Sequence, residues 1–402
     1  MKHLITLVAA ALFLSAAAVT ASAQSAKIVI SVEHVRPPKD GRPPFDGKRP
    51  AVDVALLLDT SNSMDGLISQ AKRQLWTIVG QFAKAKKGGQ TPVLRVALFE
   101  YGNSNLPASE GYIRQVVPLI DDLDKLSEAL FALSTNGGDE YCGQVIDETI
   151  TRLDWSKEPG GYRAIFIAGN EPFTQGPRDY KAACKRAIEH GIVINTIHCG
   201  EQRTGVDGKW QHGAQLAEGK SFNIDQDRVI AHIKAPQDEI IIRLNSELNG
   251  TYLWFGAKNA REGYADNQVA QDNNADRSGR GASVSRTIAK ANSVYFNTNR
   301  DLVDTLKEDR EILKKVKEEE LPEQLQKMPA RERETHIVAM GAKRSELQKK
   351  INALAAERDA YVAAQQRAAT ATGGDTTLGD AIASAIQGQL ATYGFETASV
   401  GN

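Results

Sequence analysis

The chain has 402 residues, a length that allows two or three domains and a sizeable hydrophobic core. Its 49 basic residues nearly balance its 50 acidic residues, and this balance argues against a protein that binds nucleic acid or another polyanion. Three cysteines are too few for a fold held together by disulfides.

The first residues follow the pattern of a secretory signal. A short polar start precedes an apolar run over residues 4–19, and Ala21-Ser22-Ala23 supplies a small-residue cleavage pattern. We expect residues 1–23 to be a signal peptide and the mature chain to begin at Gln24. No cysteine follows to carry a lipid, and no later stretch is long and apolar enough to span a bilayer. The protein is therefore expected to be periplasmic or secreted, with no transmembrane segment after cleavage.

Residues 24–50 are expected to lead into the first domain. Residues 27–35 have the apolar pattern of a strand, and the segment from residue 36 to residue 50 contains five prolines. The proline content predicts an extended linker.

Between residues 51 and 235, apolar strands alternate with amphipathic helices. Continuous apolar runs are typical of parallel strands that are covered on both faces. Strands are expected over residues 52–58, 93–99, 112–117, 163–168, 192–197 and 221–224, and helices over residues 67–83, 123–133, 145–153, 180–190 and 211–217. This alternation predicts an α/β domain with a doubly wound, mostly parallel sheet, whose ligand site lies at the carboxyl ends of the strands.

The C-terminal part is predicted to be helical and charged. Residues 236–298 are expected to form a polar connecting region, with a remnant strand or turn over residues 251–256 and a polar helix plus loop over residues 261–286. Two apolar stripes follow, separated by Pro322 and Pro329; they comprise Leu302, Leu306, Leu313 and Val316, then Leu347, Ile351, Leu354 and Tyr361. We expect a coiled-coil-like helical hairpin over residues 299–367. A linker and a short C-terminal helix complete residues 368–402.

A carboxylate and two hydroxyls follow the first predicted strand of the domain. Asp59, Ser61 and Ser63 occupy alternate positions just before a helix, where their oxygens can converge on one point. Hard oxygen ligands of this kind suit Mg²⁺. Capping of the helix by Asp59 or Ser61 is the alternative, but a cap needs only one such residue. The pattern therefore favours a metal site.

The segment from Val54 to Met64 resembles the opening of a von Willebrand factor type A (VWA) domain, where this motif begins the metal-ion-dependent adhesion site. The similarity extends to about residue 225, through the strand–helix alternation, the Gly137-Gly138 turn and the ending at residues 216–222. The resemblance implies a six-stranded, mostly parallel sheet with one antiparallel edge strand. It also implies that the site binds Mg²⁺, or Mn²⁺ or Ca²⁺, and captures an acidic side chain of a partner protein.

The sequence departs from the family pattern in two loops. Asp139 and Glu140 stand where the family usually has threonine, and Asn170 and Glu171 follow Gly169, which takes the position of the family's aspartate. The resemblance therefore implies metal ligands drawn from Asp59, Ser61, Ser63, Asp139, Glu140, Asn170 and Glu171. So many carboxylates allow two outcomes: the metal captures an acidic partner, or it is held tightly and accepts such a partner poorly. Both outcomes remain open.

The family's fold also suggests a disulfide. It places Cys142 and Cys199 on the same upper face, so a bridge between them is expected, with Cys184 as a free buried thiol. Three unpaired thiols are the alternative.

The remaining motifs give no sign of catalysis. The chain has no Gly-x-Ser-x-Gly elbow, no His-Glu-x-x-His pair and no phosphate-binding loop. We therefore expect an exported, non-enzymatic, metal-dependent protein-binding module with a helical accessory domain, acting in adhesion or as a scaffold. Two alternatives stand beside it. One is a structural, self-associating protein with a vestigial metal site, and the other is a hydrolase that uses Asp59, Asp139 and Glu140 around a metal.

Overall fold

A computed structural model describes residues 49–228, 232–369 and 377–396. Within these ranges, no helix is both long enough and apolar enough to cross a membrane. The expected signal peptide and the expected strand over residues 27–35 lie outside the described residues. All the described residues belong to one compact unit that spans residues 42–402.

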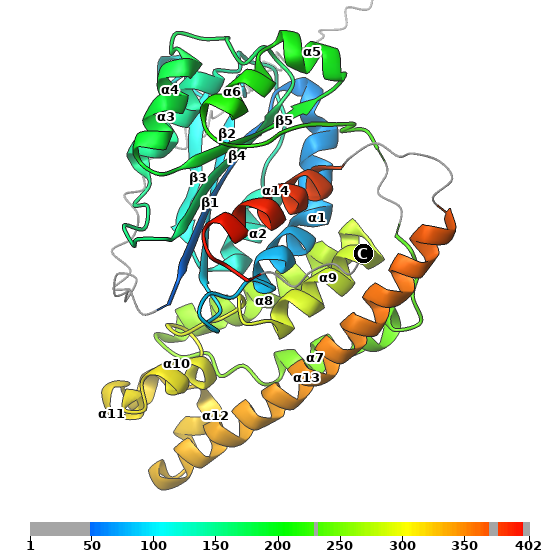
Figure 1. The fold of residues 1–402 in the computed structure, drawn as a ribbon. Helices are drawn as coiled ribbons and strands as arrows, with labels where there is room; N and C mark the ends of the chain where they lie inside the picture. The colour runs from blue at the N-terminus through cyan, green and yellow to red at the C-terminus, as the bar shows by residue number, and fades with distance from the viewer. Residues whose placement is uncertain (1–48, 229–231, 370–376, 397–402) are drawn as a thin grey trace, which may run out of the picture. The chain divides into compact units, whose positions relative to one another are not determined.

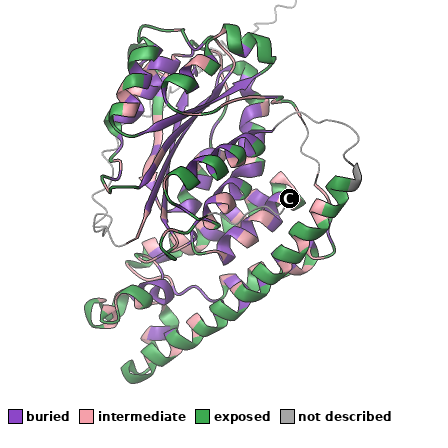
Figure 2. Cartoon of the chain, in the orientation of Figure 1, coloured by how far each residue is buried: buried purple, intermediate pink, exposed green. Residues whose placement is uncertain are grey.

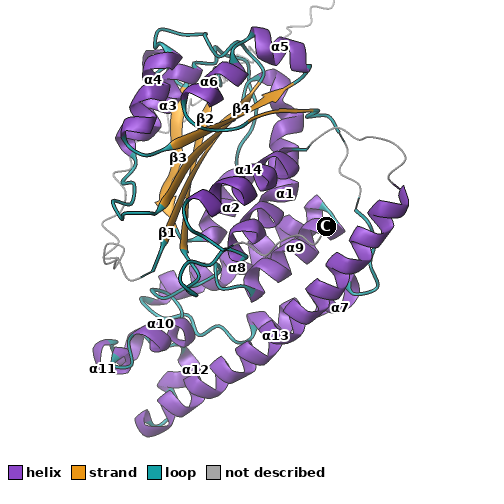
Figure 3. Cartoon of the chain, in the orientation of Figure 1, coloured by secondary structure: helices purple, strands orange, loops and turns teal. Residues whose placement is uncertain are grey.

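A six-stranded sheet forms the centre of the fold (Figures 1 and 3). The strands are β1 (Ala51–Asp59), β2 (Val93–Tyr101), β3 (Ile113–Ile120), β4 (Tyr162–Gly169), β5 (Val193–Cys199) and β6 (Ser221–Ile224). Their order across the sheet is β3-β2-β1-β4-β5-β6, and only the edge strand β3 runs antiparallel to its neighbour. The predicted fold class is confirmed, including the antiparallel edge.

Strand β1 shows why the central strands have continuous apolar sequences. All nine of its residues are buried, because helices cover both faces of the sheet. The carboxylate of Asp53, in the interior of this strand, receives two hydrogen bonds from the Arg95 guanidinium at 2.8 and 2.6 Å, and a third from the Ser156 N–H. The charge of this buried aspartate is therefore matched by a cation.

Two layers of helices enclose the sheet. One face is covered by α1 (Asp65–Ala83), α2 (Leu123–Phe131) and α14 (Leu378–Thr392), and the other by α3 (Cys142–Arg152), α4 (Tyr180–Glu189) and α6 (Trp210–Leu216). The short helix α5 (Gln202–Asp207) precedes α6. Helix α14 is the expected C-terminal helix. It packs beside α1 and against β5 and β6, so a segment distant in sequence completes the domain's own layer (Figure 1).

The region expected to be a polar connection consists of three helices that pack on the domain. They are α7 (Asp238–Asn249), α8 (Lys258–Ser278) and α9 (Arg280–Ala291). Helix α9 lies against α1, and α8 lies against α2. The loop expected within residues 261–286 consists of Gly279 alone, which separates α8 from α9. Its φ of +117° is a backbone conformation that glycine adopts readily.

The predicted helical hairpin is only half present. Its second arm is the 40-residue helix α13 (Ala330–Ala369), but the first arm is broken into α10 (Leu302–Glu308), α11 (Ile312–Lys315), a 3₁₀ turn (Glu318–Glu320) and α12 (Glu323–Gln326). Helix α10 ends at Asp309, whose backbone is extended, and Pro322 interrupts helical structure a second time. One long helix therefore cannot form over this arm. Helix α13 packs along α7 and α9 with a buried stripe and an exposed outer face (Figure 2).

Candidate metal centre

Three loops meet at the carboxyl ends of the central strands. The first loop (residues 59–64) links β1 to α1, the second loop (residues 134–141) precedes α3, and the third loop (residues 170–179) links β4 to α4. The first and third loops follow parallel strands and so emerge at the same edge, where ligand sites of open α/β sheets lie, and the second loop reaches this edge by packing Gly138 on Gly102.

The first loop folds around the carboxylate of Asp59. Its Oδ1 atom accepts a hydrogen bond of 2.7 Å from the Ser61 N–H, and the Ser61 and Ser63 hydroxyl oxygens lie 3.3 Å apart. Asp59 is fully buried, and its Oδ2 atom has no hydrogen-bond partner. Neither the 3₁₀ turn at residues 62–64 nor α1 has a side-chain cap, so these residues do not act as caps for the helix. The three predicted residues of this loop therefore lie together.

The third loop reaches the first through an amide. Asn170 donates a hydrogen bond of 3.1 Å from Nδ2 to the Ser63 hydroxyl, and its buried Oδ1 atom has no partner. Gly169 stands beside Asp59: a β-carbon there would lie 3.0 Å from Asp59 Oδ2 and 2.5 Å from the Tyr101 hydroxyl. The position that holds aspartate in the family is therefore too close to Asp59 for a side chain, and Asn170 lies next to the first loop instead.

The second loop places its two acidic residues differently. Glu140 is buried, whereas Asp139 is exposed and accepts a hydrogen bond of 3.2 Å from the Tyr141 hydroxyl. Both Glu140 and Asp59 approach Gly102: a β-carbon on that glycine would lie 2.6 Å from Glu140 Cγ and 2.9 Å from Asp59 Oδ1. Of the two acidic residues, the structure therefore brings Glu140 to Asp59 and leaves Asp139 at the surface.

The carboxylates of this cluster have strongly raised pKa values. Burial raises the pKa of Asp59 to about 7, against the lowering effect of the hydrogen bonds from Ser61, and the Glu171 charge adds to the rise. Burial raises the pKa of Glu140 to about 8, and the charges of Asp59 and Glu171 contribute. Among the described residues, no Lys, Arg or His forms an ion pair with Asp59, Glu140 or Glu171. The edge of the sheet therefore gathers acidic groups whose charged forms no cation of the described residues stabilises.

The donor atoms fit a hard divalent cation. In the described part of the chain, no group of three or more His, Cys, Asp or Glu side chains is arranged to hold a metal. A cation here would therefore also need the hydroxyls of Ser61 and Ser63 and the amide oxygen of Asn170. Oxygen donors of this kind, with one or two carboxylates and room for water, are the set that Mg²⁺ prefers. The unpartnered Oδ2 of buried Asp59 is the atom that most needs such a ligand.

Two residues near the site, Tyr101 and Gln175, could not be recognised from local sequence patterns. Tyr101 is fully buried and donates a hydrogen bond of 3.0 Å to the carbonyl of Ala168, and its hydroxyl lies, like Asp59 Oδ2, beside Gly169. Gln175 accepts a hydrogen bond of 2.9 Å from the Glu140 N–H and so joins the second and third loops. The register of β1 and β2 pairs Asp59 with Tyr101, and only that register could have indicated the role of the tyrosine.

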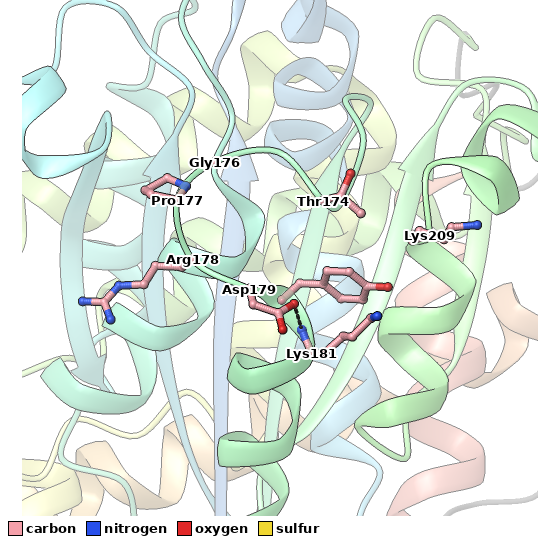
Figure 4. A pocket seen from close by; sticks show the side chains of 8 residues that line it. Thr174, Gly176, Pro177, Arg178, Asp179, Lys181 and Lys209 are labelled. Atoms are coloured by element: carbon pink, nitrogen blue, oxygen red, sulfur yellow. Dashed lines mark hydrogen bonds between the residues drawn. The ribbon is translucent and has the colours of Figure 1, made fainter.

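A cavity of about 460 Å³ adjoins this edge of the sheet (Figure 4). It is lined by the third loop and the start of α4, and Gly176 within it packs against the ring of Tyr141. Its lining includes Arg178, Lys181 and Lys209, and none of these three forms an ion pair with another described residue. Asp179 also belongs to the lining, so the three basic residues leave the cavity with a net positive charge.

The expected disulfide is not present. All three cysteines are free and buried. Cys142 and Cys184 belong to the layer of α3 and α4, with the Cys142 sulfur 3.9 Å from the Tyr101 hydroxyl, whereas Cys199 points into the opposite layer. Side chains alternate between the two faces along β5, so the sheet itself separates Cys199 from Cys142. The alternative of three unpaired thiols is the one observed.

Comparison with known proteins identifies the same part of the chain. Residues 53–221 match the model of the von Willebrand factor type A domain. No curated protein sequence matches the chain.

Several solved structures are similar. A structure of proximal thread matrix protein 1 from the mussel byssus, with a zinc-occupied MIDAS motif, is 14% identical over 45% of this chain and 43% of that one, with a TM-score of 0.35. The SpRpn10 VWA domain is 16% identical over 45% of this chain and all of that one, with a TM-score of 0.34. The pilus adhesin SpaC from Lactobacillus rhamnosus GG is 14% identical over 44% of this chain and 28% of that one, with a TM-score of 0.33. The chain thus spans less than half the length of the mussel protein and of the adhesin. The family match and the observed sheet order identify residues 53–221 as a von Willebrand factor type A domain.

Proposed function

We propose that this chain is an exported, non-enzymatic protein-binding module whose VWA domain holds Mg²⁺, or Mn²⁺ or Ca²⁺, and engages an acidic group of a partner protein. One contrast within β1 carries the metal proposal. Asp53 and Asp59 are both fully buried, and Arg95 matches the charge of Asp53, but no cation matches that of Asp59. A buried carboxylate that lacks a partner is costly unless an ion is supplied from outside.

The proposed ligands come from all three loops. Asp59, Ser61 and Ser63 would hold the ion from the first loop, Glu140 from the second and Asn170 from the third, and Glu171 would lie at the rim. When bound, the ion supplies a positive centre that attracts an anionic oxygen. The protein's part is to keep the donor oxygens in place, through the hydrogen bonds from Ser61 to Asp59 and from Asn170 to Ser63.

The proposed partner chemistry rests on the cavity beside the site. Arg178, Lys181 and Lys209 outnumber Asp179, the acidic residue of the lining; Lys181 lies in α4, and Lys209 lies in the turn between α5 and α6 (Figure 4). Such a surface attracts acidic peptides and raises their association rate. VWA domains bind proteins, and this cavity gives an acidic partner a second contact.

Export is proposed from the N-terminal pattern alone. The signal-like residues 1–23 support a periplasmic or secreted protein whose mature form begins at Gln24. N-terminal sequencing of the protein recovered from its producing cells would test this, and a retained Met1 would contradict it.

Calorimetry with MgCl₂ tests the metal site. We expect the wild type and Asp207→Ala to bind the ion and Asp59→Ala not to bind it. Asp207 is an exposed aspartate on α5, so its variant controls for the loss of one negative charge. Circular dichroism would confirm that all three proteins are folded. Equal Mg²⁺ affinity in Asp59→Ala and the wild type would overturn the metal site.

A crosslinking pull-down then tests the partner. Wild type and Asp59→Ala are compared in parallel, with and without a chelator. Proteins captured only by the wild type, and only with metal present, are the expected result. Capture that depends on neither Asp59 nor metal would contradict metal-dependent binding.

A further inference from the structure

We infer that Glu140 is the charge-setting residue of the proposed metal site: its carboxylate adds to that of Asp59, strengthens the hold on the cation and weakens the attraction for an acidic partner. The inference rests on the proposed function. It goes further because it names one residue that decides between tight ion binding and acidic-partner capture, the two outcomes that the acidic composition of these loops leaves open.

The first step is the position of the two side chains. Glu140 Cγ and Asp59 Oδ1 both lie within 3 Å of where a β-carbon of Gly102 would stand. The glycine is required there, because its φ of +80° and these contacts exclude a larger residue. Asp59 is 0% exposed and Glu140 is 5% exposed. Two carboxyl side chains therefore share one buried space, and the Oδ2 atom of Asp59 has no partner in it.

The second step is that the loop holds Glu140 in this position. Its backbone N–H donates to Gln175 Oε1 at 2.9 Å. Two residues earlier, Gly138 packs so closely on Gly102 that a β-carbon would lie 2.5 Å from the Gly102 carbonyl oxygen. The second loop is therefore attached on both sides, to the third loop and to the end of β2. Asp139 lies between these attachments, but it is exposed and its carboxylate accepts a hydrogen bond from the Tyr141 hydroxyl.

The third step is the total charge. A divalent cation with Asp59 and Glu140 as ligands makes a neutral group, and half-buried Glu171 adds a nearby negative charge. A partner's carboxylate is then attracted less strongly than by a site with one carboxylate ligand, because the Coulomb energy depends on the net charge that it meets. With a neutral side chain at position 140, the same group carries one positive charge. The cation is then held less tightly, and an anionic partner is attracted more strongly.

The test compares Glu140→Gln with Asp139→Asn. Both variants remove one carboxylate from adjacent positions in the same loop, but only the first removes the buried one. Calorimetry with MgCl₂ measures the ion, and fluorescence anisotropy of a labelled tetraglutamate peptide, at saturating MgCl₂ for each protein, measures capture of an acidic ligand. Glu140→Asp, which keeps the charge and shortens the side chain, is the third variant.

For Glu140→Gln we expect Mg²⁺ affinity to fall about 10-fold or more, and peptide affinity to rise about fivefold. Asp139→Asn should stay within about twofold of the wild type in both measurements, because exposed charges are screened by water and salt. Glu140→Asp should keep the weak peptide binding of the wild type. Thermal melts would establish that each variant is folded.

Two results would overturn the inference. One is that Glu140→Gln and Asp139→Asn change the Mg²⁺ affinity and the peptide affinity equally, which would mean that any negative charge in this loop has the same effect. The other is peptide affinity that does not rise in Glu140→Gln, including the case in which the peptide binds no variant. If the wild type binds Mg²⁺, Asp59→Ala does not, and Glu140→Gln behaves like the wild type, then the inference fails and the proposed metal site stands. If the wild type binds no Mg²⁺, both fail.

Discussion

Gln389 of α14 and Asn195 of β5 exchange two hydrogen bonds between their buried amide groups. Gln389 Nε2 donates to Asn195 Oδ1 at 2.8 Å, and Asn195 Nδ2 donates to Gln389 Oε1 at 3.1 Å. The same Oε1 atom accepts a bond of 2.7 Å from the Tyr162 hydroxyl. This pair and the Tyr162 hydroxyl join the last described helix to β5 and β4, although residues 225–377 lie between β6 and that helix in the sequence. Helix α14 is therefore part of the domain that precedes that long segment.

Substitution of Gln389 by leucine should destabilise the protein by about 2–4 kcal/mol, because it leaves buried polar groups of Asn195 and Tyr162 without partners. The free energy of unfolding in urea would measure this loss. Gln387→Leu is the matched control, since Gln387 is exposed on the same helix, and its effect should stay within about 0.5 kcal/mol. Equal effects of the two variants would show that the amide pair contributes nothing specific.

Replacement of Asp59 by asparagine should leave the metal-free protein as stable as the wild type or more stable. The variant keeps the shape of the side chain and removes a buried charge that no cation matches. Addition of Mg²⁺ at about 100 times its dissociation constant should stabilise the wild type by about 2.7 kcal/mol and leave the variant unchanged. Thermal melts with and without the ion would show both effects. A metal-free variant that melts well below the wild type would contradict this prediction.

Arg286 should be essential for the attachment of α9 to the domain. Its guanidinium is 1% exposed, pairs with Asp124 of α2 and Asp272 of α8, and lies 4.4 Å from the ring centre of Trp76 on α1. Arg286→Met would leave buried Asp124 without a cationic partner and Asp272 with Lys290 alone, at a cost of about 3–5 kcal/mol. Chemical denaturation would test this against Arg277→Met, because Arg277 is exposed on α8. A similar stability for the two variants would refute it.

The same network should contribute to acid sensitivity. Burial acts to raise the pKa of Asp272, but the adjacent Lys290 and Arg286 charges outweigh it and lower the pKa from 3.8 to about 2. A carboxyl group whose pKa is lower in the folded protein than in the unfolded chain stabilises the folded state at pH values above the unfolded-state pKa. The stabilisation is lost as the pH falls from about 4 to about 2, and it amounts to about 2 kcal/mol.

Asp272→Asn tests this acid dependence. The difference in unfolding free energy between the wild type and this variant should shrink between about pH 5 and about pH 2.5. For Asp266→Asn, an exposed position on the same helix, the difference should stay constant. A constant difference for Asp272→Asn would mean that the ion network does not titrate in this range.

The cysteines should behave as three protected thiols. All three are buried in the native protein, and the sheet separates Cys199 from Cys142 and Cys184. A thiol reagent should therefore react slowly with the folded protein and label three cysteines after denaturation without a reductant. Labelling of a single cysteine under those conditions would establish a disulfide that this fold does not contain.

Local residue patterns were sufficient to predict the sheet and the first loop. Strands buried on both faces need continuous apolar residues, as all nine buried residues of β1 show, so their positions and the parallel arrangement followed from local pattern. Asp59, Ser61 and Ser63 lie within one short turn after β1, and their proximity is a local property of the chain. The second half of helix α13 was likewise detectable, because Leu347, Ile351 and Leu354 repeat at helical spacing, although Tyr361, the last member of the predicted stripe, is exposed.

Three features depend on contacts between distant segments: which acidic residue faces Asp59, where α14 packs, and which cysteines are near each other. Asp139 and Glu140 are chemically alike and adjacent in sequence, and only the contacts of the second loop with Gly102 and Gln175 direct Glu140 inward. The position of α14 depends on buried amides that are distant in the sequence. In each case the deciding energy comes from burial between segments that are far apart along the chain, and the local periodicity of side chains carries no information about that burial.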